Sequence, residues 1–262
     1  MRSGTVKRVG LAVAAVVFVL AVVAVFGIAE MFVGLRPVED GREFNGIRVV
    51  ADGFTTVAVA PSGPESVILI DAGMDASGEA ILADLARRGL GPDAVAAVFI
   101  THGHGDHIGG LGLFPAAAVY ALEAEVPLVE GRVSPRSPMG RLMPAAPTGF
   151  EVTEPLSDGD VVVVGDTEVR VYAMPGHTVG SAAYLVNGVL FLGDSGQVDD
   201  AGALRAAPWL VTDDRARNRA SLRALAARLV EEDAGVAAVV PSHSGPANGV
   251  DLLAAFAEAT PN

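Results

Sequence analysis

An uncharged, apolar run from Val9 to Ala29 is the first feature in the pattern of hydrophobic positions along the chain. As a helix rising about 1.5 Å per residue, it would span roughly 30 Å, the thickness of a bilayer core. It has no polar face, which argues against a helix packed in a soluble core. Arg2, Lys7 and Arg8 precede it and mostly acidic residues follow, so the positive-inside rule places the N-terminus in the cytoplasm. We therefore expect residues 1–29 to be a single-pass membrane anchor, with the rest of the chain on the extracytoplasmic side.

Cleavage of this segment is the alternative, because Gly27-Ile28-Ala29 fits the small-residue cleavage site of a signal peptide. The protein would then be secreted. The apolar run is longer than the core of about 7–15 residues that is usual in signal peptides, which favours the uncleaved anchor. Residues 30–46 are predicted to be a linker and residues 47–262 the folded domain.

Within that domain, short apolar runs alternate with turns rich in Gly, Pro and Asn. The runs predict strands over 47–50, 54–60, 67–71, 95–100, 116–121, 160–164, 168–174, 182–186, 189–192 and 236–240. Asn187-Gly188 predicts a type I′ hairpin turn. Helical periodicity predicts a helix over roughly 78–89 capped by Ser77, and a long amphipathic helix capped by Thr212. Hairpins and a helix in each half predict an α/β (α+β) fold of two packed sheets with helices outside.

Acidic residues dominate the charge of the chain, whose formal net charge is −13. Because residues 1–29 hold three of the 18 basic residues and no acid, the remainder carries 31 acidic and 15 basic residues, or −16. Such a surface repels phosphate backbones, so no nucleic-acid partner is expected. The absence of cysteine excludes disulfides and thiolate ligands.

Histidine is confined to turns that follow apolar, strand-like runs. The five histidines are His102, His104, His107, His177 and His243. A single histidine in a loop would be explained by an ordinary hydrogen bond, but all five at strand ends indicate a built site.

These turns predict a two-metal site. His102 and His104, two residues apart in extended backbone, face the same side and can bind one ion. Gly103 and Gly105 allow a tight turn, so that Asp106 and His107 face a second ion a few Å away. His177 can complete the first site, His243 the second, and Asp194 can bridge them. Neutral nitrogen and hard oxygen ligands favour two Zn²⁺ ions per chain, with Fe or Mn as alternatives.

The order of these motifs resembles that of the metallo-β-lactamase superfamily. The matching segments are His102-x-His104-x-Asp106-His107, Pro175-Gly176-His177-Thr178, Gly193-Asp194-Ser195 and His243. The resemblance covers about residues 47–250. It implies a metallo-β-lactamase-like catalytic domain: an αββα four-layer sandwich of two mixed β-sheets flanked by helices, with the metal site at one edge.

The resemblance also implies a role for each site residue. His102, His104 and His177 would bind the first metal, and Asp106, His107 and His243 the second, with Asp194 bridging. Asp71, which ends a strand, matches the family's first motif and would support the metal loop without binding metal.

The expected function is a metal-dependent hydrolase (EC 3.-.-.-) acting on a small-molecule substrate. A metal-bridging hydroxide, positioned by Asp106 as the catalytic residue, would cleave an ester, thioester, lactone or related acyl bond. Without cysteine, the lactamases with a cysteine ligand are excluded, and the Asp194 bridge is atypical of the all-histidine lactamases. Gln197 stands where acyl-homoserine lactonases carry a tyrosine. The short stretch after His243 leaves no room for the C-terminal helical domain of hydroxyacylglutathione hydrolases.

Several alternatives stay open, because the family contains many activities. They are a mononuclear iron enzyme resembling persulfide dioxygenases, a phosphodiesterase, and a non-catalytic, membrane-tethered binding module. The module is disfavoured because no ligand of the motifs is missing. The sequence does not fix the substrate or the oligomeric state.

The segment 131–149 has no periodicity and is predicted to be a lid or substrate wall. Its Arg132, Arg136 and Arg141 would either hold an anionic substrate or simply be solvated.

Overall fold

The computed structural model describes residues 2–259, with the side chains of residues 2–13 and 20 excepted. Met1, residues 260–262 and the side chains of Arg2, Lys7 and Arg8 thus lie outside the described part. The chain divides into two units, Met1–Val33 and Gly34–Asn262.

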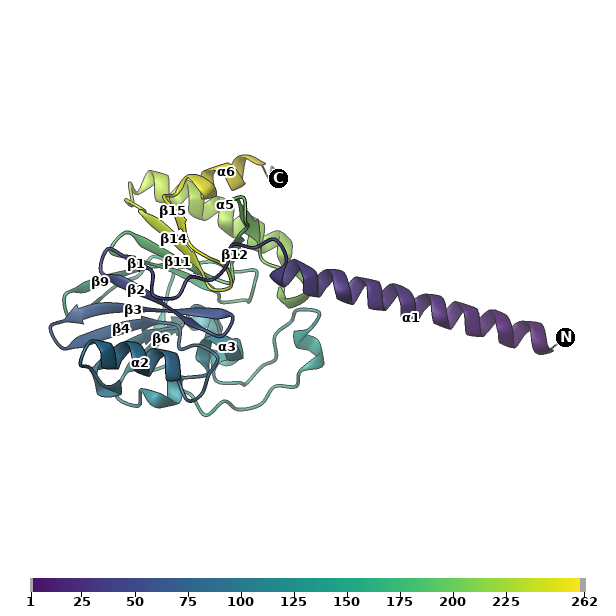
Figure 1. The fold of residues 1–262 in the computed structure, drawn as a ribbon, viewed down its shortest axis with the longest axis horizontal. Helices are drawn as coiled ribbons and strands as arrows, with labels where there is room; N and C mark the ends of the chain where they lie inside the picture. The colour runs from purple at the N-terminus through teal and green to yellow at the C-terminus, as the bar shows by residue number, and fades with distance from the viewer. Residues whose placement is uncertain (1, 260–262) are drawn as a thin grey trace. The chain divides into compact units, whose positions relative to one another are not determined.

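The first unit is a single helix, α1 (Arg2–Phe32) (Figure 1). Within it, Ala14–Phe32 is long and apolar enough to cross a membrane, with a mean hydropathy of 2.6, a criterion that signal sequences also meet. The helix continues three residues beyond the predicted end at Ala29, because Glu30-Met31-Phe32 contains no helix breaker. The predicted linker 30–46 is therefore partly helical.

The second unit contains a seven-stranded sheet in the order β1-β2-β3-β4-β5-β6-β7. The strands are β1 (Glu43–Phe44), β2 (Ile47–Asp52), β3 (Thr55–Gly63), β4 (Ser66–Ile70), β5 (Val95–Phe99), β6 (Ala118–Leu122) and β7 (Glu154–Leu156). Pairing is antiparallel from β1 to β4 and parallel from β4 to β7. The sheet therefore begins inside the predicted linker, since the two-residue strand β1 is too short to show an alternating pattern.

A six-stranded sheet, in the order β15-β14-β11-β10-β9-β8, faces the first (Figure 1). Its strands are β8 (Val161–Val164), β9 (Thr167–Ala173), β10 (Ala182–Val186), β11 (Val189–Gly193), β14 (Ala238–Pro241) and β15 (Ala247–Asn248), and β12 (Gly196–Val198) pairs separately with β13 (Leu204–Ala206). The turn between β10 and β11 has φ 48° at Asn187 and 75° at Gly188, as a type I′ turn requires.

Helices cover the outer faces of both sheets. The helices are α2 (Glu79–Arg87), α3 (Gly105–Ile108), α4 (Val126–Val129), α5 (Arg215–Glu231) and α6 (Asp251–Ala259), and the 3₁₀ turns are η1 (Pro92–Ala94), η2 (Leu111–Leu113), η3 (Glu123–Glu125), η4 (Gly140–Leu142) and η5 (Trp209–Val211). One apolar cluster, including Phe99 and Tyr184, fills the space between the sheets. A second packs α2 through Leu85 on the first sheet, and a third packs α5 and α6 on the second through Leu225 and Phe256. The predicted two-sheet α/β fold is confirmed.

Both predicted helix caps are wrong. The N-cap of α2 is Gly78, without a side-chain hydrogen bond, and the Asp75 carboxylate accepts from Glu79 N at 3.3 Å in place of Ser77. The N-cap of α5 is Asp214, which accepts from Arg217 N at 2.9 Å. The Thr212 hydroxyl instead donates to Pro208 O at 2.6 Å. In both cases a nearby carboxylate, the stronger acceptor, displaces the hydroxyl.

Candidate metal centre

Five segments bring the predicted site residues together at one edge of the two sheets. Asp71 follows β4, the His102–His107 segment follows β5, and His177 follows β9. Asp194 follows β11, and His243 follows β14. β4 and β5 are parallel neighbours, as are β11 and β14, so their carboxyl ends open at the same edge.

The first cluster consists of His102, His104, His177 and Asp194. His102 Nε2 lies 2.9 Å from His104 Nδ1 and 3.2 Å from His177 Nε2, and the latter two atoms lie 3.1 Å apart. Asp194 Oδ2 lies 3.5 Å from His177 Nε2 and 3.9 Å from His102 Nε2. A tetrahedral zinc site with Zn–N bonds of about 2.0–2.1 Å separates its ligand atoms by about 3.3 Å, so this spacing fits.

The second cluster consists of Asp106, His107 and His243. Asp106 Oδ2 lies 3.3 Å from His243 Nε2 and 3.8 Å from His107 Nε2. Asp194 also faces this cluster, with Oδ2 3.0 Å from His243 Nε2 and Oδ1 3.3 Å from His107 Nε2. One carboxylate thus lies against both clusters.

Unsatisfied atoms support a cation at this place. His107 Nε2 and Asp194 Oδ1 are buried and make no aligned hydrogen bond with the described residues. Three ring nitrogens of the first cluster point toward one another. An imidazole nitrogen without a proton can only accept a hydrogen bond, so three such nitrogens offer one another no donor. A divalent cation would satisfy these lone pairs at once, and the nitrogen and oxygen donors are those that zinc accepts.

The opposite ring nitrogens are held by protein groups, which orients each ligand. Asp71 Oδ2 lies 2.7 Å from His107 Nδ1, and Phe54 O lies 3.0 Å from His243 Nδ1. The hydroxyls of Thr101 and Thr212 lie 3.2 and 3.4 Å from Nδ1 of His102 and His177, respectively. In these four rings Nε2 is left to face the cluster.

Burial lowers the pKa of the histidines in the first cluster. The pKa of His102 falls well below its ordinary value, that of His104 falls to about 4 and that of His177 to about 3. These rings are therefore neutral at pH 7, the form that binds a metal.

Carboxylates dominate the second cluster. Burial alone would lower the pKa of its two histidines, but Asp194 and its neighbours raise that of His107 well above its ordinary value and that of His243 to about 10. Burial alone would raise the pKa of Asp106 and of Asp194. His107 and His243 nevertheless lower the pKa of Asp106 to about 2 and that of Asp194 well below its ordinary value. The carboxylates thus favour positive charge at His107 and His243, which a bound cation would supply in place of the ring protons.

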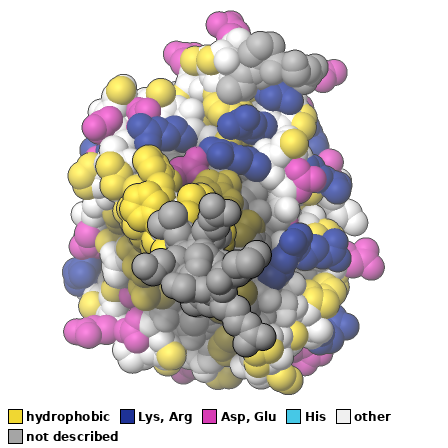
Figure 2. All heavy atoms as spheres, turned by 90° about the vertical axis from the view of Figure 1, so that its right-hand side faces the viewer, with side chains coloured by type: hydrophobic (Ala, Val, Ile, Leu, Met, Phe, Trp, Pro, Cys, Tyr) yellow, Lys and Arg dark blue, Asp and Glu magenta, His cyan; other side chains and the backbone are white. Residues whose placement is uncertain are grey.

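The ligand side chains are withdrawn from the general surface. His102, His107 and His177 are fully buried, whereas Asp106 keeps a side-chain exposure of 24% and His243 of 12%. The face in Figure 2 shows basic, acidic and apolar side chains, with no histidine among its coloured side chains. Asp106, His243 and the partly buried His104 are therefore the members of the site that solvent can reach, and they form its rim.

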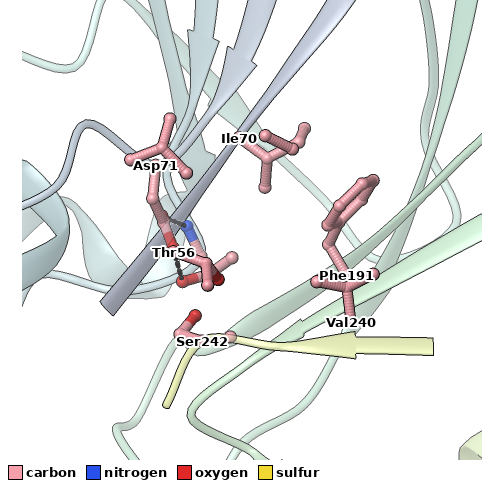
Figure 3. A pocket seen from close by; sticks show the side chains of 10 residues that line it. Thr56, Ile70, Asp71, Phe191, Val240 and Ser242 are labelled. Atoms are coloured by element: carbon pink, nitrogen blue, oxygen red, sulfur yellow. Dashed lines mark hydrogen bonds between the residues drawn. The ribbon is translucent and has the colours of Figure 1, made fainter. Parts of the chain in front are cut away.

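A small cavity lies between the sheets behind the clusters (Figure 3). Its lining combines polar and apolar side chains: Thr56, Asp71, Thr101, Ser242, Ile70, Phe191 and Val240. Strands β3, β4, β11 and β14 bound it, so it belongs to the support of the site rather than to its opening.

The segment 131–149 contains only the short turn η4. Met139 N donates to Leu210 O, and Arg136 N donates to Asp213 Oδ1, while Asp213 N donates to His177 O. These bonds tie the segment to the His177 turn. Its arginines are exposed: Arg132 pairs with Glu130, and Arg141 Nε donates to the Arg136 carbonyl.

Two buried polar residues of the site's surroundings have no role in the sequence-based prediction. Glu125, 1% exposed, accepts hydrogen bonds from two of the metal-site loops, and burial raises its pKa to about 7. Asn218 is fully buried and bonds Ser195 O and Ala207 N. Two acids, Glu123 and Glu125, lie among the apolar residues of 121–129, so the sequence does not single out Glu125.

Comparison with protein families gives a match of residues 51–243 to the model of the metallo-beta-lactamase superfamily. Over 134 residues, the chain is 37% identical to metallo-beta-lactamase domain-containing protein 1 of Mus musculus, covering 50% of this chain and 43% of that protein. Over 118 residues, it is 36% identical to a hydroxyacylglutathione hydrolase of Vibrio cholerae, covering 45% of this chain and 38% of that protein. The match thus spans less than half the length of these relatives.

Solved structures share the fold. A B3 metallo-beta-lactamase with an active-site glutamic acid superposes with a TM-score of 0.64 at 21% identity, covering 88% of this chain and 89% of that one. A metallo-beta-lactamase from Novosphingobium pentaromativorans gives a TM-score of 0.63 at 23% identity, covering 86% and 88%. At such identities the likeness concerns the fold alone.

Proposed function

Since this chain belongs to the metallo-beta-lactamase superfamily, we propose that it is a binuclear zinc hydrolase that cleaves an ester, thioester, lactone or related acyl bond. The observation that carries the proposal is Asp194, whose carboxylate faces both clusters of metal-ligating side chains. A structural metal site needs one closed cluster. Two clusters sharing one carboxylate are typical of hydrolytic centres.

His102, His104 and His177 would hold the first ion, and Asp106, His107 and His243 the second, with Asp194 between them. Ions held there would supply Lewis acidity and lower the pKa of a water molecule. Zinc is the proposed metal because histidine supplies five of the seven ligands.

Asp106 is the proposed catalytic carboxylate. It is more exposed than His243 or Asp194, so it can contact a substrate at the rim. Its low pKa keeps it ionised at neutral pH, and an ionised carboxylate accepts hydrogen bonds from the attacking water and orients it. Asp71 stays out of the reaction and fixes His107.

An acyl substrate is favoured over a phosphodiester by the relatives and by charge. Curated relatives carry the name hydroxyacylglutathione hydrolase, which denotes an acyl substrate. The formal charge of −13 disfavours a polyanionic substrate.

We further propose that α1 anchors the protein in a membrane, with the domain on the extracytoplasmic side. The apolar composition of Ala14–Phe32 supports the anchor. The basic residues Arg2, Lys7 and Arg8, which precede the apolar run, support the orientation.

Hydrolysis of a panel of small esters, thioesters and lactones by the zinc-loaded full chain tests the activity. The Asp106→Ala/His107→Ala double variant removes two ligands of the second cluster, and we expect its rate to fall by about 10²–10⁴-fold. Asp93→Ala, on the exposed turn η1, is the control and should keep the full rate. Equal rates in the double variant and the unmodified chain would overturn the proposal.

A further inference from the structure

Glu125 is a buried carboxylate that belongs to neither metal cluster. It ends η3, the turn that follows β6, and is 1% exposed. Its Oε1 accepts a hydrogen bond from Gly103 N at 2.8 Å, and its Oε2 accepts one from Gly180 N at 2.8 Å. The Thr178 side chain adds a third hydrogen bond.

The two backbone donors lie in different ligand loops. Gly103 separates His102 from His104, and Gly180 follows His177 by three residues. These loops come from different sheets, since one follows β5 and the other follows β9. One carboxylate therefore joins the loops that supply all three histidines of the first cluster.

Both glycines also pack closely against the segment that carries Glu125. A Cβ on Gly103 would lie 2.6 Å from Val129 N, and a Cβ on Gly180 would lie 2.4 Å from Glu125 N. Neither glycine has a positive φ, so space rather than backbone conformation requires glycine at these positions. Both loops thus pack directly against the segment 123–129, with the Glu125 carboxylate between them.

The second cluster is held by other contacts. His107 is oriented by Asp71, and His243 by the carbonyl of Phe54. No hydrogen bond described for Glu125 reaches either of these residues. Its influence should therefore concern the first cluster.

We propose that Glu125 is a positioning residue that sets the spacing of the His102, His104 and His177 ligands, and thereby the metal affinity of the first cluster. The inference rests on the proposed metal site. Groups that orient metal ligands typically change metal affinity by about 10–100-fold when they are lost. A carboxylate that merely stabilised the fold would have no preference between the clusters.

Zinc affinity is to be measured in two backgrounds of the purified full chain, by competition with a chelator. Asp106→Ala/His243→Ala leaves the first cluster, and His104→Ala/His177→Ala leaves Asp106, His107 and His243. We expect Glu125→Gln to weaken zinc binding about 10–100-fold in the first background and to leave it unchanged in the second. Glu123→Gln, on the exposed side of the same turn, should change neither.

Equal weakening in both backgrounds, or none in the first, would overturn the role of Glu125. Absence of zinc binding in the first background with Glu125 intact would instead overturn the proposed metal site itself. Circular dichroism reports whether Glu125→Gln folds. If it does not, Glu125→Asp keeps the charge but is one methylene too short to reach both N–H groups, and it should weaken the first cluster selectively. Unchanged affinity in Glu125→Asp would then contradict the proposal.

Discussion

Asp71 shows how a single residue connects the sheet to the metal loop. Its Oδ1 accepts from Thr101 N at 2.7 Å, and its Oδ2 accepts from the Thr101 hydroxyl at 2.8 Å and faces His107 Nδ1 at 2.7 Å. The backbone of Asp71 has φ 61°, a left-handed conformation that costs free energy in a non-glycine residue. The strain is tolerated because this conformation brings both carboxylate oxygens of Asp71 within hydrogen-bond distance of Thr101 and His107.

Asp71→Asn should therefore weaken both fold and site, since asparagine accepts left-handed backbone but replaces one acceptor oxygen by a donor. We expect the free energy of unfolding to fall by about 2 kcal/mol, measured by denaturant titration. Zinc affinity should fall about 10–100-fold, because His107 loses its orienting partner. Asp93→Asn on the exposed turn η1 is the control, and equal effects of the two variants would contradict this role.

At the scale of residues, the sequence predicted which side chains meet at the site, but it did not predict the residues that hold their loops in place. Seven residues at strand ends were expected to meet, and the structure brings them together, since the carboxyl end of β5 in one sheet meets those of β9, β11 and β14 in the other. Their binding of metal stays a prediction. The role of Glu125 could not be predicted in the same way, because its hydrogen-bond donors are backbone N–H groups, which no pattern of side chains in the sequence reveals.

At the scale of elements, the two residues that lead into α5 support the His177 turn. Asp213 N donates to His177 O at 2.9 Å, and Asp214 N donates to Gly176 O at 2.8 Å. Asn218, one turn further, donates from Nδ2 to Ser195 O at 2.9 Å and accepts from Ala207 N at 3.1 Å. The helix thus connects the turns that hold His177 and Asp194.

Asn218→Ala should leave two buried backbone groups without partners. We expect unfolding to become easier by about 2–3 kcal/mol, as measured by thermal or denaturant unfolding of the full chain. Arg219→Ala, at the next and exposed position of α5, is the matched control and should have little effect. A change for Asn218→Ala no larger than that of Arg219→Ala would show that water replaces the lost bonds.

The sequence contained a signal for Asn218 that the prediction passed over. Asn218 precedes Leu222 by four residues and Leu225 by seven, which places it on the apolar stripe of the helix. A polar residue on such a stripe is buried with partners more often than it is solvated. The helix caps were missed for a different reason, because Asp75 and Asp214 compete with the hydroxyls and the outcome depends on loop geometry.

At the scale of the whole molecule, the prediction of a two-sheet α/β fold from strand spacing is confirmed, whereas β1, β7, β12, β13, β15 and α6 went unpredicted. All of these strands have two or three residues, too few for a period-two pattern to be distinguished from a loop. The family resemblance is also confirmed. Neither the pattern nor the fold specifies the substrate, because that depends on the shape of the rim.

The anchor proposed for α1 predicts behaviour of the full chain in cells. The protein should stay in the membrane fraction after an alkaline carbonate wash, and a variant lacking residues 2–32 should not. Intact mass of the purified protein supplies the second readout. A mature chain that begins at Glu30 would show cleavage after Ala29 and contradict the anchor.

Metal analysis of the purified full chain tests the central claim most directly, since the account depends on two clusters that share Asp194. Elemental analysis after loading with zinc should give two ions per chain, and one ion for the Asp106→Ala/His243→Ala variant, which keeps the first cluster. Purification without added metal should give zinc rather than iron. One iron per chain would favour a mononuclear oxygenase, and a chain that binds no metal would favour a binding module; either result would contradict a binuclear hydrolase.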